Sequence, residues 1–110
     1  MRLLRADGNE LILETAYGEN NVYAILSHRW LPIDEQEVRY ADIVDQKPDL
    51  EAKQGWNELQ WCRQQATADG LAHVWADTAC IDKTSSQELT ESINSMYQWY
   101  TEADVCYVYL

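Results

Sequence analysis

The residues that could do chemistry in this chain gather at two points, each directly after or within an apolar run. The first is Ser27-His28-Arg29-Trp30, which follows the run Val22–Leu26, and the second spans 77–83. An arginine can hold a phosphate through two parallel hydrogen bonds, a tryptophan can stack on a base or nicotinamide ring, and an aspartate can accept from a ribose hydroxyl. We therefore predict a ligand-binding set that suits a nucleotide: Ser27, His28, Arg29, Trp30, Asp77, Asp82 and Lys83.

Each of these residues also has an ordinary structural interpretation. Ser27 and His28 could simply end a strand, and Trp30 could cover the edge of a sheet. Asp77 and Asp82 are residue types that are common in turns and helix caps. The sequence alone leaves both interpretations open.

Familiar catalytic patterns are absent from the sequence. Ser27, His28 and Asp77 suggest a hydrolase triad, but no GxSxG elbow accompanies them. His73 with two of the cysteines lacks the spacing of zinc ligands, and neither a GxGxxG nor a phosphate-binding loop occurs. Cys80 lies in an apolar run, where a buried and inert thiol is expected. We predict no catalytic residue and no metal ligand within this chain.

The elements that must position the candidate set follow from the hydrophobic pattern. Asp7-Gly8 predicts a hairpin turn, and Ser85 with Glu88 matches a helix capping box. Residues 34–54 are acidic and show little period, so we expect an irregular or lightly helical segment there. The other predicted elements are hairpin strands at 2–5 and 10–15, strands at 22–27, 71–81 and 105–110, and helices at 55–69 and from 86 to about 100.

Strands that alternate with helices predict an α/β fold of three layers around a flavodoxin-like parallel sheet. Ligands bind such sheets beyond the carboxyl ends of the strands, where both polar segments would lie. We divide the chain into an N-terminal hairpin and linker, 1–21, and a domain over 22–110. The second helix carries an apolar stripe that we expect in the core: Leu89, Ile93, Met96, Tyr97 and Tyr100. The continuous apolar run over 105–110 predicts a buried strand, so we expect the domain to be incomplete at its C-terminus.

Composition limits the partners. The chain has 110 residues, of which 19 are Asp or Glu and 8 are Lys or Arg, for a formal net charge of −11. Such a chain repels nucleic-acid backbones and anionic membranes. Three widely spaced cysteines favour reduced thiols, and neither a signal peptide nor a membrane-spanning run is visible. We expect a cytoplasmic protein with protein partners or self-association, and with no nucleic-acid, membrane or metal partner.

Several ordered blocks resemble one known family. They are Tyr23-Ala24-Ile25-Leu26-Ser27-His28-Arg29-Trp30, Asp69-Gly70-Leu71, Val74-Trp75-Ala76-Asp77-Thr78-Ala79-Cys80-Ile81-Asp82-Lys83, and Val105-Cys106-Tyr107-Val108-Tyr109-Leu110. In this order and spacing they resemble the N-terminal part of a heterokaryon-incompatibility (HET) domain. Ala76 and Ala79 depart from that pattern, in which a larger aliphatic residue and a second cysteine are frequent.

The resemblance implies a fungal protein of self/non-self recognition that signals programmed cell death. HET domains are also distantly similar to TIR domains, some of which cleave NAD, so NAD or a related nucleotide is the cofactor to test. In that comparison the catalytic glutamate lies in a later segment, so this chain would be inactive alone. Whether the family is enzymatic stays open, and a degenerate gene product without function is a third alternative.

Overall fold

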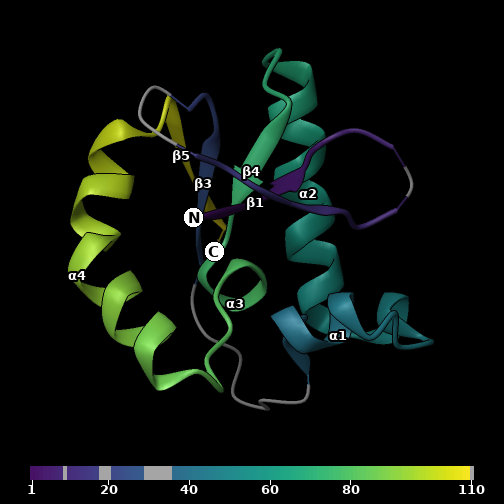
Figure 1. Ribbon diagram of the computed structural model, residues 1–110. Coiled ribbons are helices and arrows are strands. Elements are labelled where there is room, and N and C mark those ends of the chain that lie inside the picture. Colours follow the sequence, from purple (N-terminus) through teal and green to yellow (C-terminus); the bar gives the residue numbers. More distant parts are fainter. Residues whose placement is uncertain (9, 18–20, 29–35, 110) are drawn as a thin grey trace.

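The computed structural model describes residues 1–8, 10–17, 21–28 and 36–109. Its strands are β1 (Arg2–Arg5), β2 (Leu13–Thr15), β3 (Ala24–His28), β4 (His73–Trp75) and β5 (Val105–Tyr109). Its helices are α1 (Tyr40–Val44), the short 3-10 helix η2 (Leu50–Ala52), α2 (Gln54–Ala68), α3 (Asp77–Cys80) and α4 (Ser86–Glu102). The chain thus alternates strands and helices after an N-terminal hairpin, as the sequence predicts (Figure 1).

The strands form one mixed sheet in the order β2-β1-β4-β3-β5. β4, β3 and β5 are parallel, whereas β1 pairs antiparallel with both β2 and β4. The hairpin is therefore an extension of the main sheet and makes it mixed, which differs from the purely parallel sheet we expected. The physical reason is that Leu3 and Leu4 are both buried, so β1 gains more by joining the sheet than by standing apart from it.

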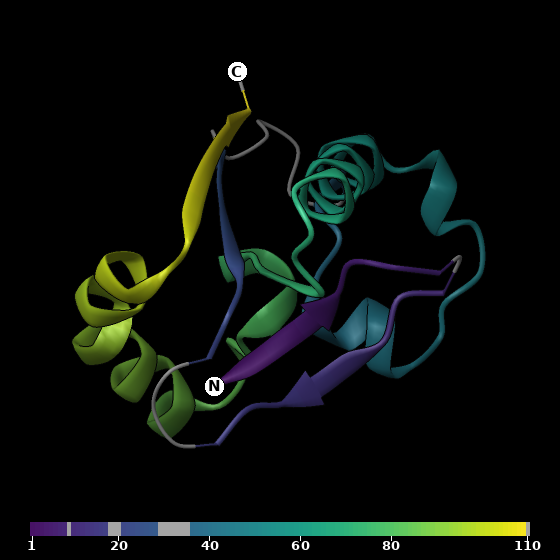
Figure 2. The same ribbon diagram turned by 90° about the horizontal axis from the view of Figure 1, so that it is seen from above.

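The parallel strands do not lie in the sheet in the order in which they occur along the chain. Along the chain these strands come as β3, β4 and β5, but in the sheet β3 lies between the other two. The two long crossover helices, α2 and α4, lie on opposite sides of the sheet (Figures 1 and 2). On the α2 side Trp61 packs edge-on against Tyr107 and Tyr109 of β5. On the α4 side Trp75 packs against Trp99, with ring centroids 5.5 Å apart.

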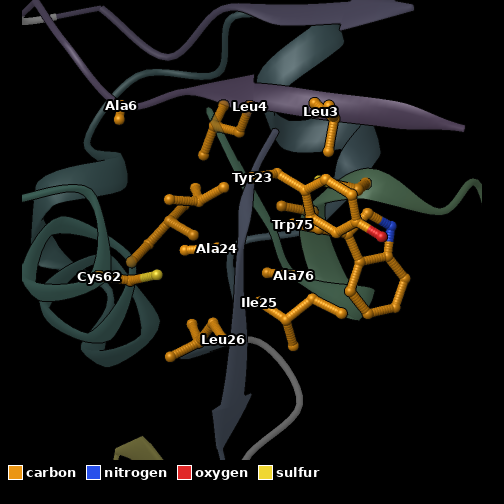
Figure 3. Close-up of a cluster of buried hydrophobic side chains, with 14 of the residues drawn as sticks. Leu3, Leu4, Ala6, Tyr23, Ala24, Ile25, Leu26, Cys62, Trp75 and Ala76 are labelled. Carbon is orange, nitrogen blue, oxygen red and sulfur yellow. The ribbon is translucent and has the colours of Figure 1, made fainter. Parts of the chain in front are cut away.

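The core is centred on β3 and β4. Tyr23, Ala24 and Ile25 are almost fully buried, as are Val74 and Trp75. Figure 3 shows Ala24 and Leu26 on the side of β3 toward the helix that carries Cys62, and Tyr23, Ile25 and Trp75 on its other side. This burial confirms the prediction that the first apolar run after the hairpin is a core strand.

The segment before α2 packs on the body through a buried carboxylate. Asp42 accepts from the backbone N–H of Arg39 and pairs with the ammonium groups of Lys53, at 2.9 Å, and Lys47, at 3.0 Å. Burial opposes ionisation of Asp42, but these donors outweigh it and lower its pKa to about 2. Gly55 permits the close approach, because a Cβ at this position would lie 2.8 Å from the carbonyl oxygen of Gln36. Val38 and Ile43 of this segment are buried in the core.

Two predicted elements differ in the structure. The strand expected over 71–81 ends at Trp75, and the rest of its apolar run forms the single turn α3, closed by Cys80 N–H donating to the Ala76 carbonyl at 2.9 Å. A buried turn satisfies the apolar pattern as well as a strand does. The strand at the C-terminus forms as predicted, but Cys106 and Val108 on its α4 side are exposed, so it is buried on one side only.

The apolar stripe of α4 is also divided. Leu89 and Met96 pack against the core, as we expected, but Ile93, Tyr97 and Tyr100 are 62%, 85% and 39% exposed. Ser92, which we did not count as a core residue, is buried instead. The side of α4 that packs on the sheet is therefore rotated about the helix axis, by about one residue position, from the side that we predicted.

Candidate functional site

The carboxyl ends of β3 and β4 bring together residues of both predicted polar segments. Ser27 stands near the end of β3, and Asp77 begins α3 directly after β4. Tyr100 from α4 reaches between them: its hydroxyl is hydrogen-bonded to the Ser27 side chain and lies in the field of the Asp77 carboxylate. Burial and Asp77 raise the pKa of Tyr100, and the Ser27 hydrogen bond opposes them. The topology therefore assembles two hydroxyls and a carboxylate from three elements.

A small hollow of about 270 Å³ adjoins this cluster. Lys83 lines it and pairs loosely with Asp77, at 3.8 Å between Nζ and Oδ2. Arg39 also lines it, so two of the chain's eight cations face the same space. The carboxylate of Asp82 lines the hollow as well, so its lining carries charges of both signs.

Asp82, the third predicted acid, is mainly a turn residue. Its carboxylate accepts from the N–H and the hydroxyl of Thr84, at 3.1 and 2.6 Å. The hydroxyl bond is the largest of the interactions that lower the pKa of Asp82. Asp82 lines the hollow beside Lys83, but its acceptor capacity is partly used by the turn. The structural interpretation of this aspartate is thus supported.

Arg2 and Glu88 form an ion pair behind this turn, although 86 positions separate them in the chain. Glu88 also accepts from the N–H of Asp82, at 3.1 Å. Burial opposes ionisation of Glu88, but Arg2 and this N–H outweigh it and lower the pKa. The predicted capping box is confirmed only on the side of Ser85, whose hydroxyl accepts from Glu88 N–H at 3.3 Å. The Glu88 carboxylate is turned toward Arg2 instead.

A larger cavity, of about 500 Å³, lies between the start of β1 and α4, and Arg2 and Glu88 are among the residues that line it. Trp75 and Trp99 line it together with hydroxyls of Ser85, Ser92 and Ser95. The indole Nε1 of Trp75 is buried and has no hydrogen-bond partner among the described residues. The cavity is polar enough to hold water or a polar ligand group beside this N–H.

The structure describes five of the seven predicted site residues. Ser27, Asp77 and Lys83 lie together, and Asp82 lies beside Lys83. His28 ends β3, opposite Tyr109 of β5, while Arg29 and Trp30 lie outside the described residues.

Sequence reasoning missed three residues at this edge of the sheet, Tyr100, Arg2 and Glu88. Tyr100 fitted the apolar stripe of its helix and Glu88 fitted a cap, so neither pattern pointed to the site. No local signal marks Arg2 as a partner of Glu88.

Cys80 is buried, as predicted, and burial raises the pKa of its thiol to about 12. The structure thus supports an inert thiol at this position. Within the described ranges, no group of three or more His, Cys, Asp and Glu side chains is placed to hold a metal ion. In the same ranges no helix has the length and apolar character needed to cross a bilayer.

Comparison with known proteins identifies the class to which this fold and site belong. The family model described as "Heterokaryon incompatibility protein (HET)" matches residues 23–110. The chain therefore belongs to the heterokaryon-incompatibility family, as the sequence blocks suggest.

A particular relative is the "Vegetative incompatibility protein HET-E-1" of Podospora anserina, to which the chain is 48% identical over 113 residues. This match covers the whole chain but only 8% of the relative's length. No solved structure matches the chain.

Proposed function

We propose that this chain is a signalling module of fungal self/non-self recognition, which acts in the cytoplasm and leads to programmed cell death. The observation that carries the proposal is the match to the HET family over residues 23–110, together with 48% identity to a vegetative incompatibility protein. The three free cysteines suit the reducing compartment in which we place its action. Because the chain spans 8% of that relative's length, the proposal concerns the module and not the whole relative.

A domain exchange in Podospora anserina tests the proposal. This chain would replace the matching segment of the relative, and incompatible strains would be brought into contact. We expect the hybrid protein to preserve the incompatibility reaction, measured as the fraction of dye-permeable cells at the contact line. A hybrid that accumulates to the normal level on an immunoblot but causes no cell death would contradict the proposal.

Two variants test whether this edge of the sheet takes part in signalling. Ser27→Ala removes the hydroxyl bonded to Tyr100, and Lys83→Ala removes a cation of the hollow. Arg5→Ala is the matched control, because its exposed side chain pairs with the exposed carboxylates of Asp7 and Glu14. We expect the Ser27 and Lys83 changes to reduce cell death and the Arg5 change to preserve it. Equal cell death in all three would mean that this edge is not a working site.

A second candidate function is the binding or cleavage of NAD or a related nucleotide. The observation that favours it is that Arg39 and Lys83 line a hollow beside the segment that follows β4, since flavodoxin-like sheets hold nucleotides beyond the carboxyl ends of their strands. We propose on the same ground that the fold is a flavodoxin- and TIR-like one. Lys83 would contact a phosphate, and Asp77 would accept from a ribose hydroxyl.

Titration calorimetry with NAD, and chromatography for released nicotinamide, test this second candidate. We expect binding that weakens about tenfold in Lys83→Ala, as loss of one charge-assisted contact implies. The same affinity in the variant, or no heat at all with NAD, would contradict this assignment. Neither result bears on the domain exchange, so the two functions are tested separately.

A further inference from the structure

The cavity between the start of β1 and α4 has buried polar side chains in its wall. Its volume, about 500 Å³, is in the range of roughly 300–1,000 Å³ that is typical of small-molecule pockets. Trp75 of β4 and Ser92 of α4 line it, and both are more than nine-tenths buried, at 0% and 3% exposed. Trp99 also lines it and packs against Trp75, with ring centroids 5.5 Å apart. The cavity therefore combines two indole rings with a buried hydroxyl.

The indole N–H of Trp75 lacks an acceptor. Its Nε1 is buried and has no hydrogen-bond partner among the described residues. Figure 3 shows this nitrogen at the edge of the ring that lies away from β3. An indole N–H can only donate, and a buried donor without an acceptor destabilises the folded state. Because Trp75 lines the cavity, a ligand oxygen that enters there can supply the missing acceptor.

Hydroxyls and a carboxylate in the wall supply complementary groups. Four side-chain hydroxyls line the cavity, those of Thr15, Ser85, Ser92 and Ser95. Each hydroxyl can both donate and accept, whereas the carboxylate of Glu91, which lines the cavity too, can only accept. Its Oε1 already accepts from the amide of Gln87 at 3.2 Å, a bond that uses one of its two oxygens. A ligand that fits this wall must therefore both accept and donate hydrogen bonds.

The charges in the wall favour a neutral ligand. The guanidinium of Arg2 is paired with Glu88, and Glu91 is a second carboxylate, so negative side chains outnumber positive ones there. An anionic ligand is repelled by this wall and by the net charge of −11 of the whole chain. A cation would not satisfy the N–H of Trp75, because a cation has no lone pair to accept a hydrogen bond. What remains is an uncharged molecule that carries several oxygens.

We propose that this cavity binds a neutral monosaccharide. Each sugar hydroxyl both donates and accepts, so one ring can accept from Trp75 Nε1 and donate to the Glu91 carboxylate. The C–H face of the ring can pack against the indole of Trp99. Of the described residues, none lines both this cavity and the hollow at Lys83. The inference therefore assigns a second site, which goes beyond the proposed signalling function and beyond the nucleotide candidate.

Two-dimensional NMR of the nitrogen-labelled chain tests the site directly. Five tryptophans give five indole N–H resonances, and the one that is missing in Trp75→Phe belongs to Trp75. The probes are D-glucose, D-galactose and D-mannose, each added up to tens of millimolar. We expect at least one sugar to move the Trp75 resonance to lower field with saturation, because a new hydrogen bond deshields the donated proton. The resonance of Trp99, identified in the same way with Trp99→Phe, should move with it.

Substitutions in the wall separate binding in the cavity from binding elsewhere. Ser95→Ala and Glu91→Gln each remove one partner of the sugar, and we expect each to weaken binding about threefold to tenfold, as loss of one hydrogen bond implies. Thr90→Ala is the matched control, since this hydroxyl lies exposed on the same helix and does not line the cavity. The remaining indole resonances report whether each variant is folded. Equal affinity in Ser95→Ala, Glu91→Gln and Thr90→Ala would overturn the inference.

Three other results would also overturn the inference. They are a Trp75 resonance that none of the three sugars moves, a saturable shift with inorganic phosphate or tetramethylammonium, and a magnetisation transfer from water to the Trp75 N–H that the sugars leave unchanged. The second result would assign the cavity to a charged ligand, and the third would assign it to ordered water only. None of these outcomes bears on the domain exchange, so a failure of the sugar site leaves the signalling function standing.

Discussion

Arg63 should be among the most important single residues for stability, because it joins the N-terminal hairpin to α2. Its side chain is 2% exposed and donates to four backbone carbonyls of the hairpin. Those of Arg5, Asp7, Gly8 and Glu10 lie 2.9 to 3.1 Å away. Burial lowers the pKa of the guanidinium, so the charge is held there by these carbonyls against the cost of desolvation. Arg63→Met keeps much of the volume and removes every donor.

The size of the effect follows from the carbonyls that lose their partner. A hydrogen bond to a charged group contributes about 1.5–3 kcal/mol, and the four bonds share one side chain, so their contributions do not add fully. We expect a loss of about 3–5 kcal/mol in the free energy of unfolding, similar to breaking a buried charged network. This is a large part of the roughly 5–15 kcal/mol that holds a domain together.

Urea unfolding followed by tryptophan fluorescence measures the loss. With a slope of about 1.5–2 kcal/mol/M, the midpoint should fall by about 1.5–3 M. Arg5→Gln is the control, since it removes an exposed ion pair with Asp7 and should leave the midpoint nearly unchanged. If Arg63→Met moves the midpoint no further than Arg5→Gln does, the hairpin is not held by this arginine and the reasoning is wrong.

Three further predictions concern the packing. The pKa of Asp42 is about 2 in the folded chain against 3.8 ordinarily, so ionised Asp42 adds about 2 kcal/mol of stability above pH 5, which is lost as pH falls through about 4 toward 2. The advantage of the wild type over Asp42→Asn in urea unfolding should therefore shrink over that range, and a constant difference would refute it. Gly55→Ala should lower the melting temperature, although alanine favours helices, because its Cβ would meet backbone; an unchanged or higher value would contradict this. Native protein should react with a thiol reagent at Cys106 only, because Cys62 and Cys80 are buried. Mass spectrometry that finds label on either buried thiol before unfolding would disprove their inaccessibility.

Several elements could be predicted from the sequence because their signals are local. The helix expected over 55–69 is observed at Gln54–Ala68, and Ser85 caps the next helix as its spacing with Glu88 indicates. The apolar run before Ser27 forms the buried strand β3. In each case neighbouring residues decide the outcome, either through hydrophobic period or through a cap, so the prediction needs no knowledge of distant partners.

The candidate site was predictable only in part. Strand alternation correctly indicated that Ser27 and Asp77 would meet at one edge of the sheet, because parallel strands present their carboxyl ends together. Tyr100 could not be identified, since its spacing on the helix fits a core residue equally well. Arg2 and Glu88 meet only because β1 joins the sheet beside β4, a pairing between distant segments.

The sequence by itself determined the acidic charge, the alternation of strands and helices, and the blocks that assign the chain to the HET family. Tertiary structure alone decided which side of α4 faces the sheet and how far β4 extends. An apolar period along a helix indicates that a side chain can be buried. The position of the sheet that packs against the helix decides whether it is buried. This is why Leu89 and Met96 pack inward while Ile93 and Tyr97, of the same stripe, remain exposed.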